Sequence, residues 1–379
     1  MKLPVMLILV LTGVVFSSCN SNAGTQVSEL TDNNNQAAHF SLNETDSCTI
    51  LNIKSPWQGA AGVEHIYYLA DVAQAQYLRV PRTSLIITPV RKIVCMSSTH
   101  VAMICALGEQ RSIAGISGTN YVYDETILQM IDSGLISEVG YDSGINSEVI
   151  LRISPDLIMM YGIGNESAGY ISRISGLGLK VMFNADYLET NPLSRAEWIR
   201  VFGALYCKKK LADSIFKSLS YDYNLVKEKV KKNISEKPRV LLGLPYRDTW
   251  YVSPGNSYIN TLITDAGGYY LWNDTESDFS MPYSFESVFV RSLNADFWLN
   301  TGSADSKKEI SAFDSRLEKI PGFHSGKIYN NTSRMSAGGG NDYWESGTMN
   351  PQIILKDIAS ILHPGLFPEH DLVYYKKIE

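Results

Sequence analysis

Along the chain, short apolar runs alternate with longer stretches in which apolar and polar positions are mixed. In the first half, the runs lie at residues 93–96, 113–116, 157–161 and 181–183. Each run suits a buried strand and each intervening stretch can hold a helix, which is the pattern of βα units around a mainly parallel sheet. A second set lies at residues 240–244, 295–299 and 327–329. The pattern therefore predicts an α/β fold with two parallel-sheet lobes.

The residues between these two sets predict a helical bridge. Residues 192–232 contain no strand-like run, and in their second part apolar side chains recur at intervals of three and four, at Leu211, Ile215, Phe216, Leu219, Tyr223, Val226 and Val230. This spacing places them on one face of a helix. A helix over residues 208–232 would be about 37 Å long at 1.5 Å per residue. We therefore expect one long rigid helix that joins the lobes and permits only small closing motions.

Ahead of the first lobe, residues 39–53 and 64–69 alternate between apolar and polar positions, as strands with one buried face do. A turn is predicted between them at residues 55–59. We expect these residues to form an edge hairpin of the first lobe.

The first residues have the pattern of an export signal. Lys2 precedes an apolar run at residues 5–16, which is too short to cross a bilayer, and small residues follow up to Cys19. This pattern resembles the lipobox of bacterial lipoproteins, although Phe16 stands where Leu is usual. The resemblance implies that residues 1–18 are removed and that Cys19 carries a lipid anchor. The alternative is an ordinary signal peptide with an incidental cysteine.

The predicted organisation therefore has five parts. Residues 19–36 are rich in Asn, Ser, Thr and Gly and cannot bury enough apolar surface to fold. We expect a signal peptide at 1–18, a flexible tether at 19–36, a first α/β lobe with its hairpin at 37–191, a bridging helical segment at 192–235 and a second α/β lobe at 236–379.

Charge and cysteine usage narrow the functional classes. The sequence has 33 Lys and Arg against 39 Asp and Glu, so it lacks the basic excess that binds a phosphate backbone, and we expect no nucleic-acid partner. Cys48, Cys95, Cys105 and Cys207 match no zinc-ligand spacing. We expect buried free thiols at Cys95 and Cys105, leave a disulfide open, and assign no metal ion and no cofactor.

The two halves also share an internal repeat. Glu148 begins a short helical stretch that leads to an Asp, an apolar run and a Gly over residues 156–162, and Glu286 begins a similar stretch before residues 296–302. A glutamate in the first turn of a helix stabilises the helix dipole, which is a sufficient structural reason for either residue alone. One matching carboxylate in each lobe also indicates a surface that both lobes present together.

Several segments, in this order and spacing, resemble the periplasmic binding proteins for iron chelates, haem and cobalamin. They lie at residues 91–100, 107–108, 113–116, 146–148, 154–158, 176–181 and 350–364. The resemblance covers about residues 85–367. It implies two α/β lobes joined by one rigid helix, with the ligand held in the cleft between the lobes.

The resemblance also implies a function and its partners. The chain would be the substrate-binding lipoprotein of an ABC importer, in the periplasm or cell envelope, that captures a metal chelate such as a ferric siderophore, haem or a corrinoid. In the family, one surface glutamate of each lobe docks onto arginines of a dimeric permease in the inner membrane, and Glu148 and Glu286 match those positions. We expect a monomer.

Loops that follow the strands supply the candidate ligand contacts, because ligands in open α/β sheets bind beyond the carboxyl ends of the strands. Aromatic side chains dominate these loops and suit a flat tetrapyrrole or catechol ligand, although each could equally belong to the core. An arginine, either Arg247 or Arg334, could bind a ligand carboxylate through a bidentate hydrogen bond. The expected ligand-binding residues are Ser98, Tyr121, Tyr123, Arg247, Trp250, Tyr251, Tyr283 and Trp344.

Two further segments are expected at the cleft. His100 is predicted near a helix start, where it would cap the helix or, less simply, ligate haem iron. The glycines at 338–340 lack the downstream Lys and Ser or Thr of a phosphate-binding loop and are predicted to form a mobile cleft loop.

Two other functional classes remain open. An exported enzyme, such as a hydrolase or chelatase acting on the same ligands, would need a convergent catalytic set, and the sequence has neither G-x-S-x-G nor H-E-x-x-H. Asp342, Glu345 and His363 are near one another in sequence, which is weak evidence for such a set. We assign no catalytic residue. A surface adhesion module is the third class, and the long α/β alternation disfavours it.

Overall fold

The computed structural model describes residues 36–141, 144–162, 174 and 176–379. The expected signal peptide, Cys19 and the expected tether up to residue 35 lie outside the described residues. Among the helices of the described part of the chain, none is long and apolar enough to cross a membrane.

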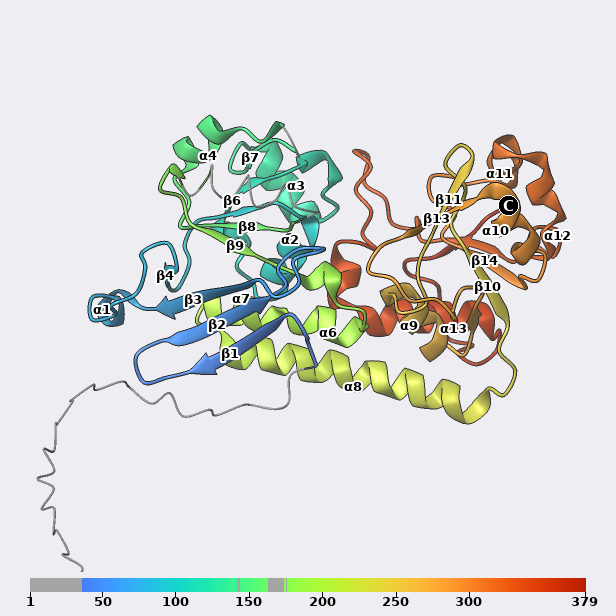
Figure 1. The fold of residues 1–379 in the computed structure, drawn as a ribbon, viewed down its shortest axis with the longest axis horizontal. Coiled ribbons are helices and arrows are strands. Elements are labelled where there is room, and N and C mark those ends of the chain that lie inside the picture. The colour runs from blue at the N-terminus through green and yellow to red at the C-terminus, as the bar shows by residue number, and fades with distance from the viewer. Residues whose placement is uncertain (1–35, 142–143, 163–173, 175) are drawn as a thin grey trace, which may run out of the picture. The chain divides into compact units, whose positions relative to one another are not determined.

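The first lobe is built on a five-stranded parallel sheet with the order β7-β6-β5-β8-β9 (Figure 1). Its strands are β5 (Ile93–Cys95), β6 (Ile113–Ile116), β7 (Ser137–Glu138), β8 (Leu157–Met160) and β9 (Val181–Phe183). Three of them are buried along their whole length, as apolar runs in a parallel sheet should be. The helices are α2 (Ser98–Ala106), α3 (Glu125–Asp132) and α4 (Ser147–Ile153), with 3-10 helices η1 (Gln110–Ser112), η2 (Thr119–Tyr121) and η4 (Asp186–Leu188).

The second lobe repeats this plan with the order β12-β10-β14-β15-β16, in which β16 is antiparallel to its neighbour. Its strands are β10 (Arg239–Leu242), β12 (Tyr269–Tyr270), β14 (Phe297–Leu299), β15 (Ile328–Asn330) and β16 (Lys376–Lys377). Its helices are α9 (Tyr258–Asp265), α10 (Phe285–Ser292), α11 (Lys307–Phe313), α12 (Pro321–His324) and α13 (Pro351–Leu362), with η5 (Ser315–Lys319) and η6 (Ser346–Met349). The predicted fold class of two parallel-sheet α/β lobes is confirmed.

A two-stranded antiparallel ribbon in the second lobe was not expected. It consists of β11 (Thr249–Val252) and β13 (Met281–Ser284), which pair Trp250 with Tyr283. The sequence analysis placed both segments in cleft loops. Their alternating buried and exposed side chains are those of short strands with one covered face.

The N-terminal residues form a separate sheet rather than an edge hairpin of the first lobe. The sheet has the order β1-β2-β3-β4, with β1 (Phe40–Glu44), β2 (Thr49–Lys54), β3 (Glu64–Ala70), β4 (Leu85–Ile87) and the short helix α1 (Val72–Ala75). β4 pairs in parallel with β3, so it completes this sheet and not the sheet of the lobe. We call this element the N-terminal sheet. Its turn between β2 and β3 covers residues 55–63.

The predicted bridge is present as three helices, α6 (Pro192–Glu197), α7 (Ile199–Leu205) and the 25-residue α8 (Lys209–Asn233). α8 packs against α7 and also against α9 and α13 of the second lobe. Its apolar stripe is the covered face, because Phe216, Leu219, Tyr223 and Val230 are buried. One continuous helix therefore contacts elements of both halves.

The internal repeat has a structural reason in the fold. The Asp156 carboxylate accepts hydrogen bonds from the backbone N–H groups of Arg91 and Lys92, 2.8 and 2.9 Å away, at the start of β5. The Asp296 carboxylate accepts the corresponding bond from Arg239, 2.8 Å away, at the start of β10. Each Asp thus joins two neighbouring parallel strands at their amino ends.

Candidate ligand-binding cleft

A cavity of about 500 Å³, here called the cleft pocket, is lined by both lobes and by the N-terminal sheet. One wall is the β2–β3 turn, and a second is the segment after β9 at residues 187–190 together with Arg195. The third is formed by residues 253, 254, 256–259 and 277–280 with Trp344. The volume lies within the range of about 300–1,000 Å³ that is usual for small-molecule sites.

Arg195 is the positive charge of this pocket. It lies in the last turn of the six-residue helix α6, whose N-cap Asn191 accepts the N–H of Leu193, 2.8 Å away. Its guanidinium lies 4.9 Å from the centre of the Tyr258 ring, and its Nε is 3.7 Å from the Asp186 carboxylate. The 3.7 Å separation is longer than a hydrogen bond, and Tyr258 forms a side-chain hydrogen bond with Arg195. A guanidinium has five N–H donors, so Arg195 can still donate to an anionic group.

Burial controls the neighbouring ionisable groups. Desolvation raises the pKa of the Asp186 carboxyl, and the charge of Arg195 opposes that shift. Desolvation also raises the pKa of Tyr187 to about 12, so its hydroxyl stays protonated at neutral pH. That hydroxyl accepts the N–H of Gln58, 3.1 Å away, and donates to the carbonyl of Gly162.

Sequence reasoning missed Arg195. A signal for it existed, because Asn191-Pro192 marks a helix start shortly after the buried strand β9. Short helices that follow such a strand lie near the edge of the sheet where ligands bind. The two arginines that were considered lie elsewhere: Arg247 is exposed and stacks on Tyr246, and Arg334 pairs with Asp342 at 2.6 Å.

Among the expected ligand-binding residues, Trp344 is the one that lines the cleft pocket. Its side chain is 48% exposed, and it packs edge-on against Tyr343. Phe279, 53% exposed, lines the same pocket from the second lobe.

The structure places the other expected residues at separate points. Tyr121 and Tyr251 are exposed, Ser98 and Tyr283 are half-buried, and none of these four lines the cleft pocket. Tyr123 lines a neighbouring cavity of about 420 Å³, where the Arg334 guanidinium lies 5.0 Å from the centre of its ring.

Trp250 must be removed from the ligand-binding set. It is fully buried, donates its indole N–H to the carbonyl of Leu242 at 3.1 Å, and stacks on Trp298 with ring centres 6.2 Å apart. Successive strand residues point to opposite faces, so Trp250 enters the core while Tyr251 faces outward.

His100 is also wrongly placed by the sequence analysis. It is fully buried within α2, beside Phe202, and Ser97 is the residue that caps this helix. Desolvation lowers the pKa of His100 to about 3, so the ring is neutral at physiological pH. It neither caps the helix nor faces the cleft pocket.

The glycines at 338–340 do not form a free loop but lie against the first lobe. A Cβ on Gly338 would lie 2.4 Å from the carbonyl oxygen of Asn120, and a Cβ on Gly340 would lie 2.6 Å from that of Tyr121. Glycine is therefore needed here for close backbone approach. The segment fastens the two lobes together at this point.

Glu345 continues this contact between the lobes. It is buried, and its carboxylate accepts the backbone N–H groups of Tyr123 and Asp124, 2.8 and 2.9 Å away. Desolvation raises the pKa of Glu345 to about 7, against the opposing effect of these two hydrogen bonds.

The acidic and histidine residues that an enzyme might have used do not converge. Glu345 binds the backbone at the start of α3, Asp342 pairs with Arg334, and a ring nitrogen of His363 lies 3.3 Å from the carbonyl of Gly267. Within the described residues, no group of three or more His, Cys, Asp or Glu side chains is arranged to hold a metal ion.

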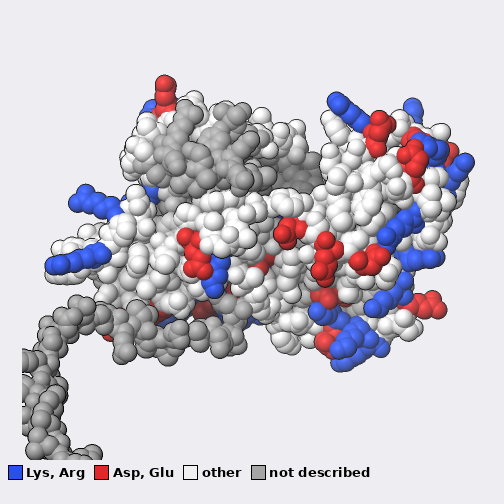
Figure 2. Space-filling model, in the orientation of Figure 1, with Lys and Arg blue, Asp and Glu red and all other residues white. Residues whose placement is uncertain are grey.

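Glu148 and Glu286 occupy the same position in equivalent helices. Each is the second residue of its helix, after the N-caps Asn146 and Ser284, and each side chain is exposed. They differ in one respect, because Glu286 lies 3.5 Å from Arg316, which Asp314 also binds at 2.6 Å. On the face shown in Figure 2, acidic and basic side chains are interspersed.

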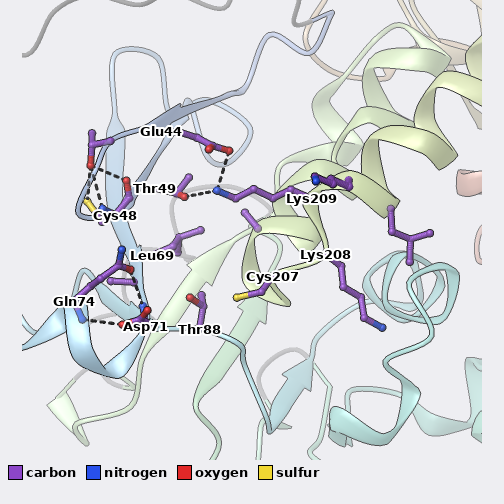
Figure 3. A pocket seen from close by; sticks show the side chains of 15 residues that line it. Glu44, Cys48, Thr49, Leu69, Asp71, Gln74, Thr88, Cys207, Lys208 and Lys209 are labelled. Carbon is purple, nitrogen blue, oxygen red and sulfur yellow. Dashed lines mark hydrogen bonds and ion pairs between the residues drawn. The ribbon is translucent and has the colours of Figure 1, made fainter.

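A second cavity, of about 610 Å³, lies between the N-terminal sheet and the start of α8 (Figure 3). We call it the sheet cavity. Lys209 crosses one side of it and binds Glu44 and Thr49 at 2.8 and 2.7 Å. Cys48 and Cys207 are among its lining residues, and the four described cysteines are all free; Cys95 is buried and Cys105 half-buried.

Comparison with known proteins shows the family to which this chain belongs. A profile of the periplasmic binding protein family matches residues 93–333, more than half of the chain. An uncharacterized lipoprotein of Methanocaldococcus jannaschii is 28% identical over 298 residues, which cover 76% of this chain and 69% of that protein.

Two solved structures have the same fold. A periplasmic haem-binding protein of Pseudomonas aeruginosa has a TM-score of 0.53 at 15% identity, covering 76% of this chain and 98% of that one. An Fe3+-hydroxamate transport protein of Saccharomonospora viridis has a TM-score of 0.53 at 19% identity, covering 73% and 94%. The chain belongs to the periplasmic binding protein family, which implies a location in the periplasm or cell envelope.

Proposed function

We propose that this protein captures a metal chelate in the cleft pocket and delivers it to the dimeric permease of an ABC importer. The observation that carries the proposal is the pocket itself. It is lined from both lobes, and it combines the guanidinium of Arg195 with the aromatic side chains of Tyr258, Phe279 and Trp344. Flat or conjugated chelates gain from aromatic contact, and their acidic groups gain from an arginine.

Titration tests this proposal. Haem, a corrinoid and ferric siderophores would each be added to the purified protein while tryptophan fluorescence is followed. We expect at least one to bind with a dissociation constant in the nanomolar to micromolar range, about −8 to −12 kcal/mol. Flat responses to all of them would contradict the proposal, and chemical conversion of a bound chelate would favour the enzyme alternative.

We also propose that the protein is anchored to the membrane through a lipid on Cys19. The proposal is supported by the apolar run at residues 5–16 and by the lipoprotein that is among the relatives. Cell fractionation of the wild type and of Cys19→Ser tests it. We expect the wild type in the membrane fraction with the mass of a lipid, and the variant in the soluble fraction. A soluble wild type without lipid mass would refute the anchor.

Docking is proposed to use Glu148 and Glu286. Their support is their matching position, one in each lobe, and their exposure to solvent. Exposed carboxylates can form charge-assisted hydrogen bonds with arginines of a permease. The ion pair between Glu286 and Arg316 would have to exchange for a permease arginine, and exposed pairs of this kind cost little to break.

A further inference from the structure

The N-terminal sheet supplies one wall of the cleft pocket, although it precedes the region that matches the family. The match begins at residue 93, whereas the four strands of the sheet lie between residues 40 and 87. The β2–β3 turn contributes residues 55 and 57–61 to the pocket lining. A segment outside the shared core therefore shapes the site where the ligand is expected.

The turn is held firmly on the side of the first lobe. The Trp57 ring is buried 5.1 Å from the ring of Phe183, which ends β9. The next residue, Gln58, donates its backbone N–H to the hydroxyl of Tyr187, 3.1 Å away. Residues 57 and 58 are thus fixed to the same segment that leads to Arg195.

The start of the N-terminal sheet is fixed to this segment as well. The buried Glu189 carboxylate accepts the backbone N–H groups of Ala38 and His39, 3.1 and 3.0 Å away. Glu197, also buried, accepts those of Gln36 and Ala37 at 2.7 and 2.8 Å. Charged acceptors that satisfy several buried donors hold their partners in one geometry.

On its other side the same turn reaches the second lobe. The side-chain amide of Gln58 donates a hydrogen bond to the carbonyl of Asp278, in the loop at residues 277–280 that carries Phe279. Gln58 therefore contacts both sides of the cleft pocket. The pocket has three walls, and the wall formed by the β2–β3 turn lies ahead of the region that matches the family.

We propose that the β2–β3 turn is a specificity wall, which restricts the cleft pocket to compact, oxygen-rich ferric chelates, and that Gln58 holds the loop at 277–280 beside the bound molecule. The inference rests on the proposed function. Its chemistry comes from the lining, where Arg195 stands with the amides of Gln58 and Asn256 and the hydroxyls of Ser277 and Ser280. Such groups donate to carboxylate or hydroxamate oxygens. A corrinoid with its nucleotide loop is far larger than a compact chelate of this kind.

The first test places a large side chain on the β2–β3 turn, where it would occupy part of the cleft pocket. Ala61 lines the pocket and is exposed, so Ala61→Trp should fold normally while its ring occupies ligand space. Ala73→Trp, on the exposed surface of α1 and outside the pocket lining, is the matched control. Calorimetric titration would use ferric citrate, a ferric trihydroxamate, hemin and cyanocobalamin as probes.

We expect the wild type to bind one of the two compact ferric chelates, Ala61→Trp to bind it at least tenfold more weakly, and Ala73→Trp to match the wild type within twofold. Equal affinity in Ala61→Trp would overturn the wall. Binding of hemin or cyanocobalamin alone would overturn the ligand class while leaving the proposed function intact. Binding of no probe by the wild type would count against the proposed function itself.

The second test asks whether Gln58 holds the loop at residues 277–280. It needs no ligand, so it gives a result whichever probe the protein binds. Hydrogen exchange of the peptide that contains residues 277–280 would be measured by mass spectrometry in the wild type, Gln58→Ala and the exposed control Gln76→Ala. We expect severalfold faster exchange in Gln58→Ala, because the hydrogen bond to Asp278 is lost, and no change in Gln76→Ala. Unchanged exchange in Gln58→Ala would show that the turn does not hold this loop and would overturn the inference.

Discussion

The cleft pocket and the sheet cavity have comparable volumes, about 500 and 610 Å³, but their charged side chains are arranged differently. In the sheet cavity, Lys209 is bound directly to Glu44 and Thr49. In the cleft pocket, Arg195 stands 3.7 Å from its carboxylate partner and beside an aromatic ring. The cleft pocket therefore keeps an arginine that can bind a ligand, whereas two of the three lysines that line the sheet cavity, Lys208 and Lys209, are bound to carboxylates of the protein.

The two cavities also differ in how their walls are held. Glu44 at the sheet cavity has a side chain that is 69% exposed, so its ion pair is screened by water. Glu189 at the cleft pocket is buried and satisfies backbone groups. The comparison teaches that volume alone does not identify a ligand site, and that fixed walls and available donors distinguish it.

The largest effect is expected from the carboxylates that hold the walls. Glu189→Ala removes the acceptor of three N–H donors, those of Ala38, His39 and the Trp198 indole. We expect the free energy of unfolding to fall by about 3 kcal/mol or more, because each buried donor left without a partner costs about 1–3 kcal/mol. Urea unfolding followed by circular dichroism measures the change.

Glu44→Ala is the matched variant at the sheet cavity. It removes an exposed ion pair with Lys209, and we expect a loss of no more than about 1 kcal/mol. If both variants lost the same stability, the distinction between a fixed wall and a solvated one would be wrong.

A pH dependence is expected from the contact between the lobes beside the cleft pocket. The pKa of Glu345 is about 7 in the folded protein against 4.5 for an ordinary glutamate. Between these values the folded protein keeps a proton that the unfolded chain releases, so stability is highest below about pH 4.5 and falls as the pH rises through about 7. The full difference is of the order of 3 kcal/mol.

Glu345→Gln cannot titrate and should lack this slope. Melting temperatures of the wild type and the variant, measured in steps from pH 4 to pH 8, test the prediction. We expect the melting temperature of the wild type to fall relative to that of the variant as the pH rises. Parallel curves across this interval would mean that Glu345 is ionised in the folded protein throughout.

A smaller effect is expected from the cation that each cavity presents, Arg195 in the cleft pocket and Lys209 in the sheet cavity. Arg195→Lys keeps the charge but loses the planar fork and its stacking on Tyr258. We expect the chelate to bind about tenfold more weakly, a loss of about 1.4 kcal/mol. Lys209→Met at the sheet cavity should leave chelate affinity unchanged. Calorimetry on both variants tests the pair, and a stronger effect from Lys209→Met would place the ligand in the sheet cavity.

The smallest effect on stability is expected from the two proposed docking residues, which lie outside both cavities. Changing Glu148 and Glu286 together to Ala should lower stability by about 0.3–1 kcal/mol each, because both carboxylates lie in the first turn of a helix. Chelate affinity should stay unchanged while uptake by cells that depend on the protein is abolished. Normal uptake with only a slightly lower melting temperature would leave both residues as helix stabilisers.

The sequence by itself determined the repeating parts of this protein. Buried strands, amphipathic helices and the long α8 follow from local periodicity, because burial of one face imposes the spacing of apolar residues within a single element. The repeat that contains Glu148 and Glu286 was visible for the same reason, since each copy is contiguous. Trp344, which was expected at the cleft because it lies in an aromatic loop that follows a strand, lines the cleft pocket, and its contact with a ligand stays a prediction.

Only the tertiary structure decided which side chains meet in the cleft pocket. Trp250 and Trp344 have similar local sequence surroundings, rich in aromatic and polar residues, yet the pairing of β11 with β13 turns Trp250 into the core. Gln58 and Asp278, which share a hydrogen bond, are 220 residues apart in the sequence. His39 and Glu189, which also share one, are 150 residues apart. Contacts of this length depend on how separate elements pack, and a local pattern of apolar and polar residues carries no information about which distant partner an element will meet.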